Sequence, residues 1–216
     1  SGRTRFSRGG DGRATLGSVI REYVISEAMA GLGIATSRSL AIIATGEPVL
    51  REAPEPGAIL VRTAASHVRV GSFQYAAAHR GRPALQTLAD HVIERTEQEL
   101  IDSESRYIEL LAAVIARQAR LVAQWMLVGF IHGVMNTDNM SVAGETIDFG
   151  PCAFIDEFKS NKVFSSIDRH GRYAWDQQAG VANWNLTQLA ATLLPLLDED
   201  EERAVAIARE QLEQFT

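Results

Sequence analysis

The fold is indicated most directly by His132-Gly-Val-Met-Asn-Thr-Asp-Asn139, followed by Thr146-Ile-Asp-Phe-Gly150. Polar residues fill most of the first stretch, whereas the second is an apolar run that contains one carboxylate. Between them lies another apolar run, 140–142, and then Ala143-Gly144-Glu145, which has the composition of a turn. We therefore predict a polar loop over 132–139 and a small β-hairpin with strands at 140–142 and 146–149.

The polar residues at the ends of these stretches suit a magnesium site. Mg²⁺ prefers octahedral oxygen ligands and bridges phosphate groups. A hairpin folded back on itself can bring Asn139 and Asp148 to opposite sides of one ion. Asp138 would then lie close enough to an acceptor hydroxyl to take its proton. The alternative is that Asp138 and Asn139 form a polar turn and Asp148 caps a chain end. The position of both stretches after a long helix favours the metal site.

The same order of residues parallels the catalytic loop of protein kinases and the Asp-Phe-Gly that follows it. One position differs. The third residue of a kinase loop that begins His-Arg-Asp or His-Gly-Asp is the catalytic Asp, and here it is Val134, which cannot accept a proton. Phosphoryl transfer by the usual base is therefore disfavoured, and Asp138 is the one carboxylate within 132–139.

Helical and strand patterns surround this region. The resulting prediction is an α+β protein with a kinase-like, two-lobed fold, divided into about 1–80 with a helix and strands and about 81–216 with the catalytic loop and metal site. Turn residues fill 46–57, and 150–180 is expected to be irregular. The predicted helices are 14–32, 83–98, 103–130, 184–197 and 201–215, and the predicted strands are 39–44 and 58–63.

Composition narrows the class of protein. The chain has 216 residues, of which 46% are apolar, and a formal net charge of −6, which suits a folded domain and argues weakly against nucleic-acid binding. Charged and amide side chains interrupt the most apolar stretch, 107–131, so we predict a buried helix and no membrane span. Cys152 is the only cysteine, which excludes an internal disulfide. The histidines show no zinc-ligand spacing.

Three further features could bind phosphate. Arg62 follows an apolar strand, and Arg69 comes seven residues later. A guanidinium group can bind two phosphate oxygens at once and keeps its positive charge. The segment Gly9-Gly-Asp-Gly-Arg13 could present backbone N–H groups to phosphate. Glu22 lies in the first helix, as does the kinase glutamate that pairs with the ATP-binding lysine. Taken alone, each of these also fits an ordinary surface residue or loop.

The chain resembles the selenoprotein O family over most of its length and in order. The most specific match is His132 to Met140 followed by Ile147-Asp-Phe-Gly-Pro151. The further matching stretches are Ser1-Gly-Arg-Thr4, Gly9 to Arg13, Ile20-Arg-Glu-Tyr23, Ser26-Glu-Ala-Met29, Val61 to His67, Phe164 to Asp168, Gly171-Arg-Tyr-Ala174 and Trp184-Asn-Leu186.

This resemblance implies a pseudokinase fold that binds ATP in a flipped orientation and transfers AMP to Ser, Thr or Tyr hydroxyls of target proteins. It implies Asp138 as the proton acceptor and Asn139 and Asp148 as ligands of Mg²⁺, or of Mn²⁺, with Asp148 also facing ATP. The remaining implied nucleotide-site residues are Asp11 and Gly12 in the glycine-rich loop, Glu22 as the partner of the family's lysine, and Arg62 and Arg69 on the terminal phosphates.

Further expectations concern the partners, the localisation and the completeness of the chain. The partners expected are ATP and proteins, with no nucleic acid and no membrane, in a bacterial cytoplasm or, for a eukaryote, a mitochondrion. The chain has no starting Met, and the family's first glycine-rich segment, its lysine and its C-terminal region are missing. We therefore expect a piece of a longer protein that by itself binds ATP weakly and is nearly inactive. The alternatives are a phosphotransferase and an ATP-binding pseudoenzyme that regulates a partner.

Overall fold

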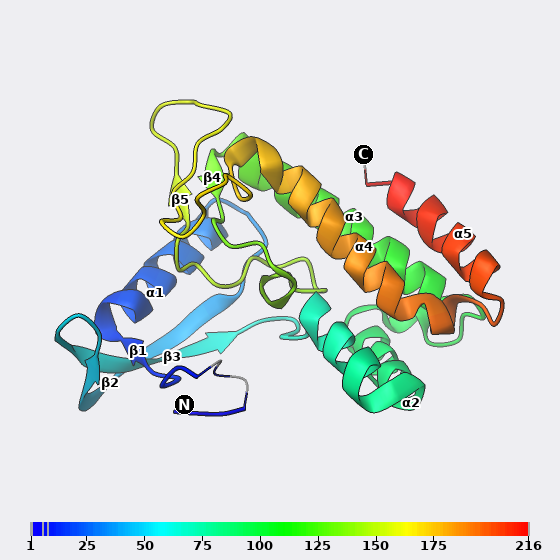
Figure 1. The fold of residues 1–216 in the computed structure, drawn as a ribbon, viewed down its shortest axis with the longest axis horizontal. Coiled ribbons are helices and arrows are strands. Elements are labelled where there is room, and N and C mark those ends of the chain that lie inside the picture. The colour runs from blue at the N-terminus through cyan, green and yellow to red at the C-terminus, as the bar shows by residue number, and fades with distance from the viewer. Residues whose placement is uncertain (1, 6, 8, 216) are drawn as a thin grey trace.

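The computed structural model describes residues 2–5, 7 and 9–215, so Ser1 of the first family-like stretch lies outside the described residues. A sheet with one helix forms one side of the molecule and the remaining long helices form the other (Figure 1). This arrangement confirms the α+β class. The division at about residue 80 stays a prediction.

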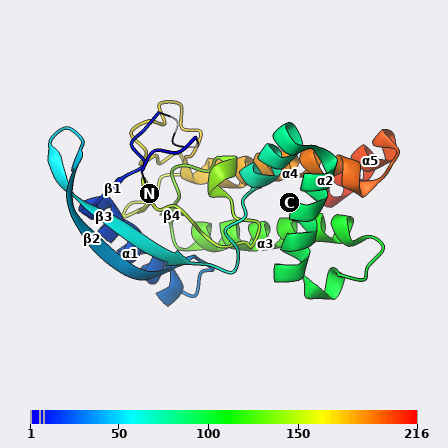
Figure 2. The same cartoon turned by 90° about the horizontal axis from the view of Figure 1, so that it is seen from below.

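The larger sheet is antiparallel, with the order β1-β3-β2. Its strands are β1 (Ala14–Thr15), β2 (Arg38–Leu50) and β3 (Pro54–Thr63). Helix α1 (Leu16–Gly31) begins where the Thr15 hydroxyl accepts from the Ser18 N–H, and it packs against β2 and β3. Figure 2 shows β2 and β3 as one long curved hairpin with α1 beside it.

The prediction of turns over 46–57 was wrong for most of that range. β2 continues to Leu50 and β3 begins at Pro54, which leaves only 51–53 for the turn. The register shifts between Ala44 and Pro48, and Pro48 then lies opposite Pro56. Because proline has no N–H, two prolines can face each other only in a pair that exchanges no ladder hydrogen bonds. The hairpin therefore accommodates residues that usually end a strand.

Every helix that the sequence predicted is present, some with different starts. α2 (Val70–Thr96) begins well before the predicted residue 83 because two helical segments join at Gly81, whose φ is 74°. The first segment has a short apolar pattern, with Val70, Phe73 and Ala76 buried. α4 begins six residues before the predicted 184. The other helices are η1 (Gln98–Leu100), α3 (Arg106–Leu127), η2 (Thr137–Asn139), η3 (Trp175–Gln177), α4 (Gln178–Leu197) and α5 (Glu201–Glu213).

Helix α3 lies at the centre of the helical core. It packs against α4 and α5 and buries Leu111, Val114 and Trp125. Within the described part of the chain, it is also the one helix whose length and apolar composition would suffice to cross a membrane. Its charged residues and its packing against two other helices match the core helix that the sequence predicted.

The segment after α3 does not form the predicted β-hairpin. β4 (Phe130–Ile131) pairs with β5 (Ala153–Phe154), which closes the base of the whole stretch between them. Within that stretch, Ser141 bridges to Arg69, and Thr146 bridges to Thr36. The two flanks of the Gly144 turn therefore pair with distant segments instead of with each other. The prediction was wrong because strand patterning identifies an extended segment but not its partner.

The buried Thr146 hydroxyl links α3, the segment after the Gly144 turn and the segment before β2. Trp125 Nε1 donates to Thr146 Oγ1 (2.9 Å), which in turn donates to the Ala35 carbonyl (2.9 Å). We expect Thr146→Val to leave the indole N–H without an acceptor and to lower the free energy of unfolding by about 2 kcal/mol. Chemical denaturation measures this change. Thr187→Val, at an exposed position of α4, is the control, and equal effects for the two variants would contradict the prediction.

Candidate functional site

The polar loop 132–139 is held in place by a buried histidine. The His132 ring is inaccessible to solvent, and its Nδ1 accepts from the Val134 N–H (3.4 Å). Because that nitrogen accepts, Nε2 must carry the proton and donate to the Ile147 carbonyl (2.9 Å). This bond joins the start of the loop to the residue before Asp148. Burial lowers the pKa of His132 below its usual value, which keeps the ring neutral.

Two side chains of α4 hold the same loop from the other side. Gln178 accepts from the His132 backbone N–H (3.0 Å) and donates to the Phe130 carbonyl (3.0 Å). Asn185 donates to the Met135 carbonyl (2.8 Å). Both amides are fully buried. No motif in the sequence indicates a role for these two residues, although Asn185 lies in one of the family-like stretches.

Asp138, Asn139 and Asp148 line one cavity of about 1080 Å³, together with Arg69. Asn139 Nδ2 donates to the Val134 carbonyl (3.1 Å). Because a carbonyl only accepts, the amide nitrogen must face it, which leaves Asn139 Oδ1 for another partner. Asp138 lies at the middle of η2, where its N–H donates to Asn136 Oδ1 (3.0 Å). The structure thus brings the predicted proton acceptor and both predicted metal ligands to one cavity.

Asp148 adopts a backbone conformation that is uncommon for a residue with a side chain. Its φ is 73°, in the left-handed region, and it is the one described non-glycine residue with a positive φ. Such strain persists where the surroundings fix the chain. Here Arg21 of α1 does so, because its guanidinium donates to the carbonyls of Gly150 (2.8 Å) and Cys152. No motif in the sequence indicates this role for Arg21, although it precedes Glu22 in a family-like stretch.

Glu22 connects α1 to both the sheet and the Asp148 segment. Its Oε2 accepts from Arg62 Nη2 (2.5 Å), and its Oε1 accepts from the Phe149 N–H (2.8 Å). Burial, together with the nearby Asp148 carboxylate, raises the pKa of Glu22 to about 7. Arg62 and the Phe149 N–H act in the opposite direction. Glu22 therefore contacts one predicted phosphate-binding residue directly and lies beside a predicted metal ligand.

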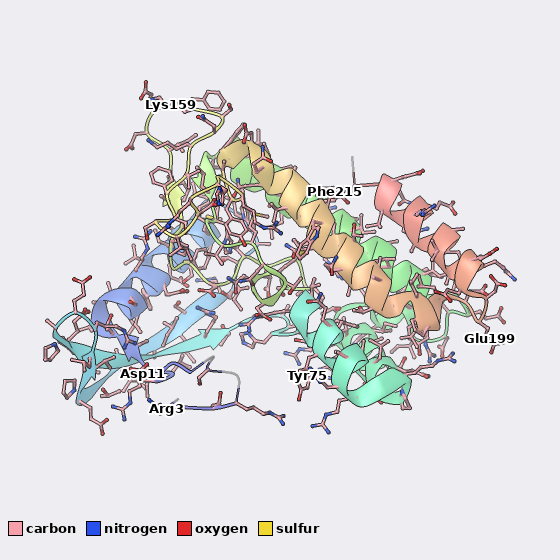
Figure 3. The ribbon with its side chains drawn as sticks, in the orientation of Figure 1. Arg3, Asp11, Tyr75, Lys159, Glu199 and Phe215 are labelled. Atoms are coloured by element: carbon pink, nitrogen blue, oxygen red, sulfur yellow. The ribbon has the colours of Figure 1, made fainter. Side chains whose placement is uncertain are left out.

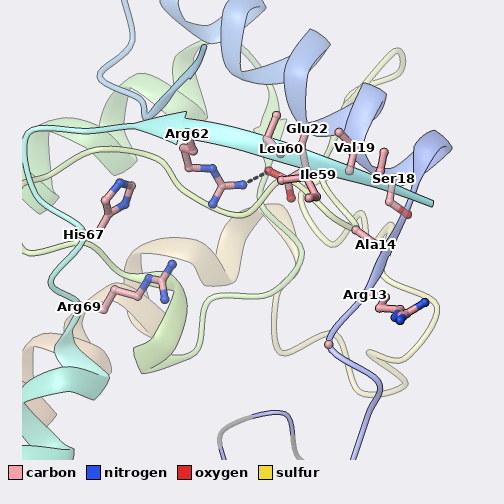
Figure 4. Close-up of a pocket in the computed structure, with 12 residues that line it drawn as sticks. Arg13, Ala14, Ser18, Val19, Glu22, Ile59, Leu60, Arg62, His67 and Arg69 are labelled. Atoms are coloured by element: carbon pink, nitrogen blue, oxygen red, sulfur yellow. Dashed lines mark hydrogen bonds and ion pairs between the residues drawn. The ribbon is translucent and has the colours of Figure 1, made fainter. Parts of the chain in front are cut away.

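A second cavity, of about 640 Å³, adjoins the first. Its lining includes Gly12, Glu22, Arg62, His67 and Arg69. Figure 4 shows the side chains of Arg62, His67 and Arg69 on the same side of the chain that leads from β3 into α2. Arg69 lines both cavities, and its Nε is buried without a hydrogen-bond partner among the described residues. The Arg69 side chain therefore contributes a positive charge to the lining of both cavities.

Asp11 forms an ion pair with Arg51. It lies in the segment that passes beside the sheet (Figure 3), where its carboxylate pairs with Arg51 (2.9 Å) and accepts from the Arg13 N–H (3.0 Å). The Arg51 guanidinium holds the pKa of Asp11 at about 2. Its neighbour Gly12 lines the smaller cavity, so the glycine-rich segment reaches that cavity through its backbone.

The oxygen atoms at Asn139 and Asp148 suit a magnesium ion. Both are hard ligands, and an ion that keeps several waters and binds substrate phosphates needs only one or two protein carboxylates or amides. Within 2–5, 7 and 9–215, no group of three or more His, Cys, Asp and Glu side chains gathers as a metal cage. Asn139 and Asp148 therefore suit a metal site that is completed by a phosphate ligand better than a structural metal site that is closed by protein ligands alone.

The fold and cavities describe an α+β protein in which an amide–carboxylate pair lines one cavity with Arg69, and Arg69 also lines a second cavity with Arg62. Comparison with known proteins gives the family. The sequence model described as "Protein adenylyltransferase SelO" matches residues 1–215. The chain belongs to the SelO family.

Curated relatives agree with this assignment. Proteins named "Protein nucleotidyltransferase YdiU" are 66% identical in Shewanella denitrificans, 59% in Rhodopseudomonas palustris strain HaA2 and 58% in Shouchella clausii, each over 215 residues. The matches cover 100% of this chain but only 42%, 44% and 44% of those relatives. The chain therefore spans less than half of the length of the curated relatives that it matches.

The buried His132 predicts a pH dependence of stability. Its pKa is depressed in the folded state, so the unfolded state binds a proton first as the pH falls below about 6.5. The stabilisation is complete above that pH and is lost below it, by up to about 1.4 kcal/mol per pH unit. We expect His132→Gln to remove this slope between pH 6.5 and 5.5 in urea unfolding. His91→Gln, at an exposed position, should keep it, and equal slopes for His132→Gln and the unsubstituted protein would contradict the prediction.

Proposed function

We propose that the protein carrying this chain is a protein adenylyltransferase that moves AMP from ATP to Ser, Thr or Tyr hydroxyls. The observation that supports this most is the shared cavity of Asp138, Asn139 and Asp148, which meets the Arg62 and Arg69 cavity at Arg69. Membership of the SelO family supports the same reaction class. The kinase-like, two-lobed arrangement is part of this proposal.

The reaction would place the acceptor hydroxyl beside Asp138. The hydroxyl oxygen forms a bond to the α-phosphorus of ATP, and the bond from that phosphorus to the β-bridging oxygen breaks. The hydroxyl proton passes to the Asp138 carboxylate, and pyrophosphate leaves. A positioned general base of this kind contributes about 10² to 10⁴ in rate. Val134 occupies the position of the kinase base and cannot take the proton, so Asp138 has that role here.

The arginines would stabilise the leaving group. When AMP is transferred, negative charge develops on the β- and γ-phosphates, and preorganised guanidinium groups stabilise that charge in the transition state. The Nε of Arg69 is buried and has no hydrogen-bond partner among the residues that the structure describes, so it is a donor available to a phosphate oxygen. Arg62 forms an ion pair with Glu22, and the resemblance places it on the terminal phosphates as well.

Asn139 Oδ1 and the Asp148 carboxylate would hold Mg²⁺, with Mn²⁺ as a substitute. The ion, when bound, neutralises phosphate charge and polarises the phosphorus–oxygen bonds. The positive φ of Asp148 and the contacts of Arg21 fix the carboxylate side of this pair. The contact from Asn139 to Val134 fixes the amide side. Gly12 is proposed as a backbone contact to the nucleotide, and Asp11 as a residue that shapes its loop through Arg51.

Labelled ATP separates this function from its alternatives. In the complete natural protein that carries this chain, we expect protein-bound label from α-labelled ATP and none from γ-labelled ATP. Label from the γ-phosphate would instead indicate a phosphotransferase. Absence of both labels, with ATP still bound, would indicate a regulatory binding module.

Two variants test the proposed roles within that assay. Asp138→Asn should lower AMP transfer by about 10² or more while Mg²⁺–ATP binding is retained, because it removes only the proton acceptor. Asp148→Ala should lose metal-dependent nucleotide binding together with transfer. Asp156→Asn, at an exposed carboxylate, is the control. Undiminished transfer by Asp138→Asn would refute its role as the base.

A further inference from the structure

Gly71 lies directly against the side chain of Asp138. It is the second residue of α2, and a Cβ atom built on it would fall 2.3 Å from Asp138 Oδ1. The same Cβ would lie 3.4 Å from Asp138 Cγ and 3.4 Å from the Thr137 carbonyl oxygen. Ordinary van der Waals contacts of a Cβ begin at about 3.4 Å. The carboxylate oxygen therefore occupies space that only a glycine leaves open.

The backbone at this position does not itself require glycine. Gly71 is helical and its φ is not positive, in contrast to Gly81 of the same helix. At an ordinary helical position alanine is more favourable than glycine by about 1 kcal/mol. Local conformation therefore favours alanine at residue 71, and the contact with Asp138 is the feature that opposes it.

The backbones on both sides of this contact are tied to neighbouring segments. The Val70 N–H, which precedes Gly71, donates to the Met140 carbonyl (3.0 Å), so the start of α2 is tied to the residue after η2. On the other side, the Asp138 N–H donates to Asn136 Oδ1, and the Asn139 N–H donates to the Asn136 carbonyl (2.9 Å). An added methyl group must therefore be accommodated by rotation of the Asp138 side chain.

We propose that Gly71 is a positioning residue for Asp138: the space that it leaves open sets where the carboxylate meets the acceptor hydroxyl. This inference rests on the proposed function, since it assigns Gly71 a part in the same proton transfer. Gly71 lines the same cavity as Asp138, Asn139 and Asp148, so its effect is local to that site. A displacement of about 1 Å in a reacting group can lower a rate by about 10²-fold.

The test is a double-mutant cycle in the complete natural protein, with AMP transfer from α-labelled ATP as the readout. We expect Gly71→Ala to lower the transfer rate by about 10²-fold while Mg²⁺–ATP binding changes by less than about threefold. In the Asp138→Ala background, Gly71→Ala should have no further effect, because the oxygen that it displaces is gone. Gly180→Ala, in α4 with nothing within 4 Å of the added methyl group, should keep the unsubstituted rate.

Stability provides a second readout that does not depend on activity. If Gly71→Ala destabilises the fold through the overlap, Asp138→Ala should restore the midpoint of thermal unfolding in the double variant, because it removes the overlapping oxygen. Failure of Asp138→Ala to restore a lost midpoint would overturn the inference.

Other outcomes separate this inference from the function on which it rests. An unchanged transfer rate in Gly71→Ala would overturn the positioning role and leave the proposed function intact. The positioning role would also be overturned if Gly71→Ala lowered the transfer rate equally with Asp138 present and in the Asp138→Ala background, or if Mg²⁺–ATP binding fell in parallel with transfer. Both results would leave the proposed function intact. Absence of AMP transfer in the unsubstituted protein would remove the proposed function, and the positioning role with it.

Discussion

The hydrogen bond from the His132 ring to the Ile147 carbonyl is the constraint on which the site depends. It crosses a loop whose base is closed by the pairing of β4 with β5, and it lies between the segments that carry Asn139 and Asp148. Because the ring is buried and neutral, it donates from one nitrogen and accepts at the other, which fixes both segments at once. Gln178 and Asn185 of α4 then connect this loop to the helical core.

Charged residues of α1 and of the chain between β3 and α2 contact the segments that this hydrogen bond joins. Arg21 and Glu22 are neighbours on α1, and both contact the chain just after Asp148: Arg21 through the carbonyls of Gly150 and Cys152, and Glu22 through the Phe149 N–H. Glu22 also holds Arg62, so α1 contacts both the segment that carries Asp148 and an arginine of the smaller cavity. Arg69 completes the connection, because its backbone pairs with Ser141 and its side chain lines both cavities.

Sequence alone predicted the helices well where a long apolar pattern marks a core face, as in α3. It did not predict which distant segment an extended stretch would join: Thr146 pairs with Thr36, and local patterning contains no information on that partner. The candidate residues were found because Asn139, Asp148 and the arginines carry recognisable chemistry. Gln178, Asn185 and Gly71 contribute hydrogen bonds or open space, which appear only when the chain is folded, so their chemistry did not mark them, although Asn185 lies in a family-like stretch.

The most direct measurement is an experimental structure of the complete natural protein with Mn²⁺ and a non-hydrolysable ATP analogue, with the metal located by its anomalous scattering. We expect one Mn²⁺ coordinated by Asn139 Oδ1, by an Asp148 carboxylate oxygen and by phosphate oxygens, with the Asp138 carboxylate facing the α-phosphorus. A metal bound elsewhere, or Asn139 and Asp148 without a shared ion while nucleotide is present, would contradict it.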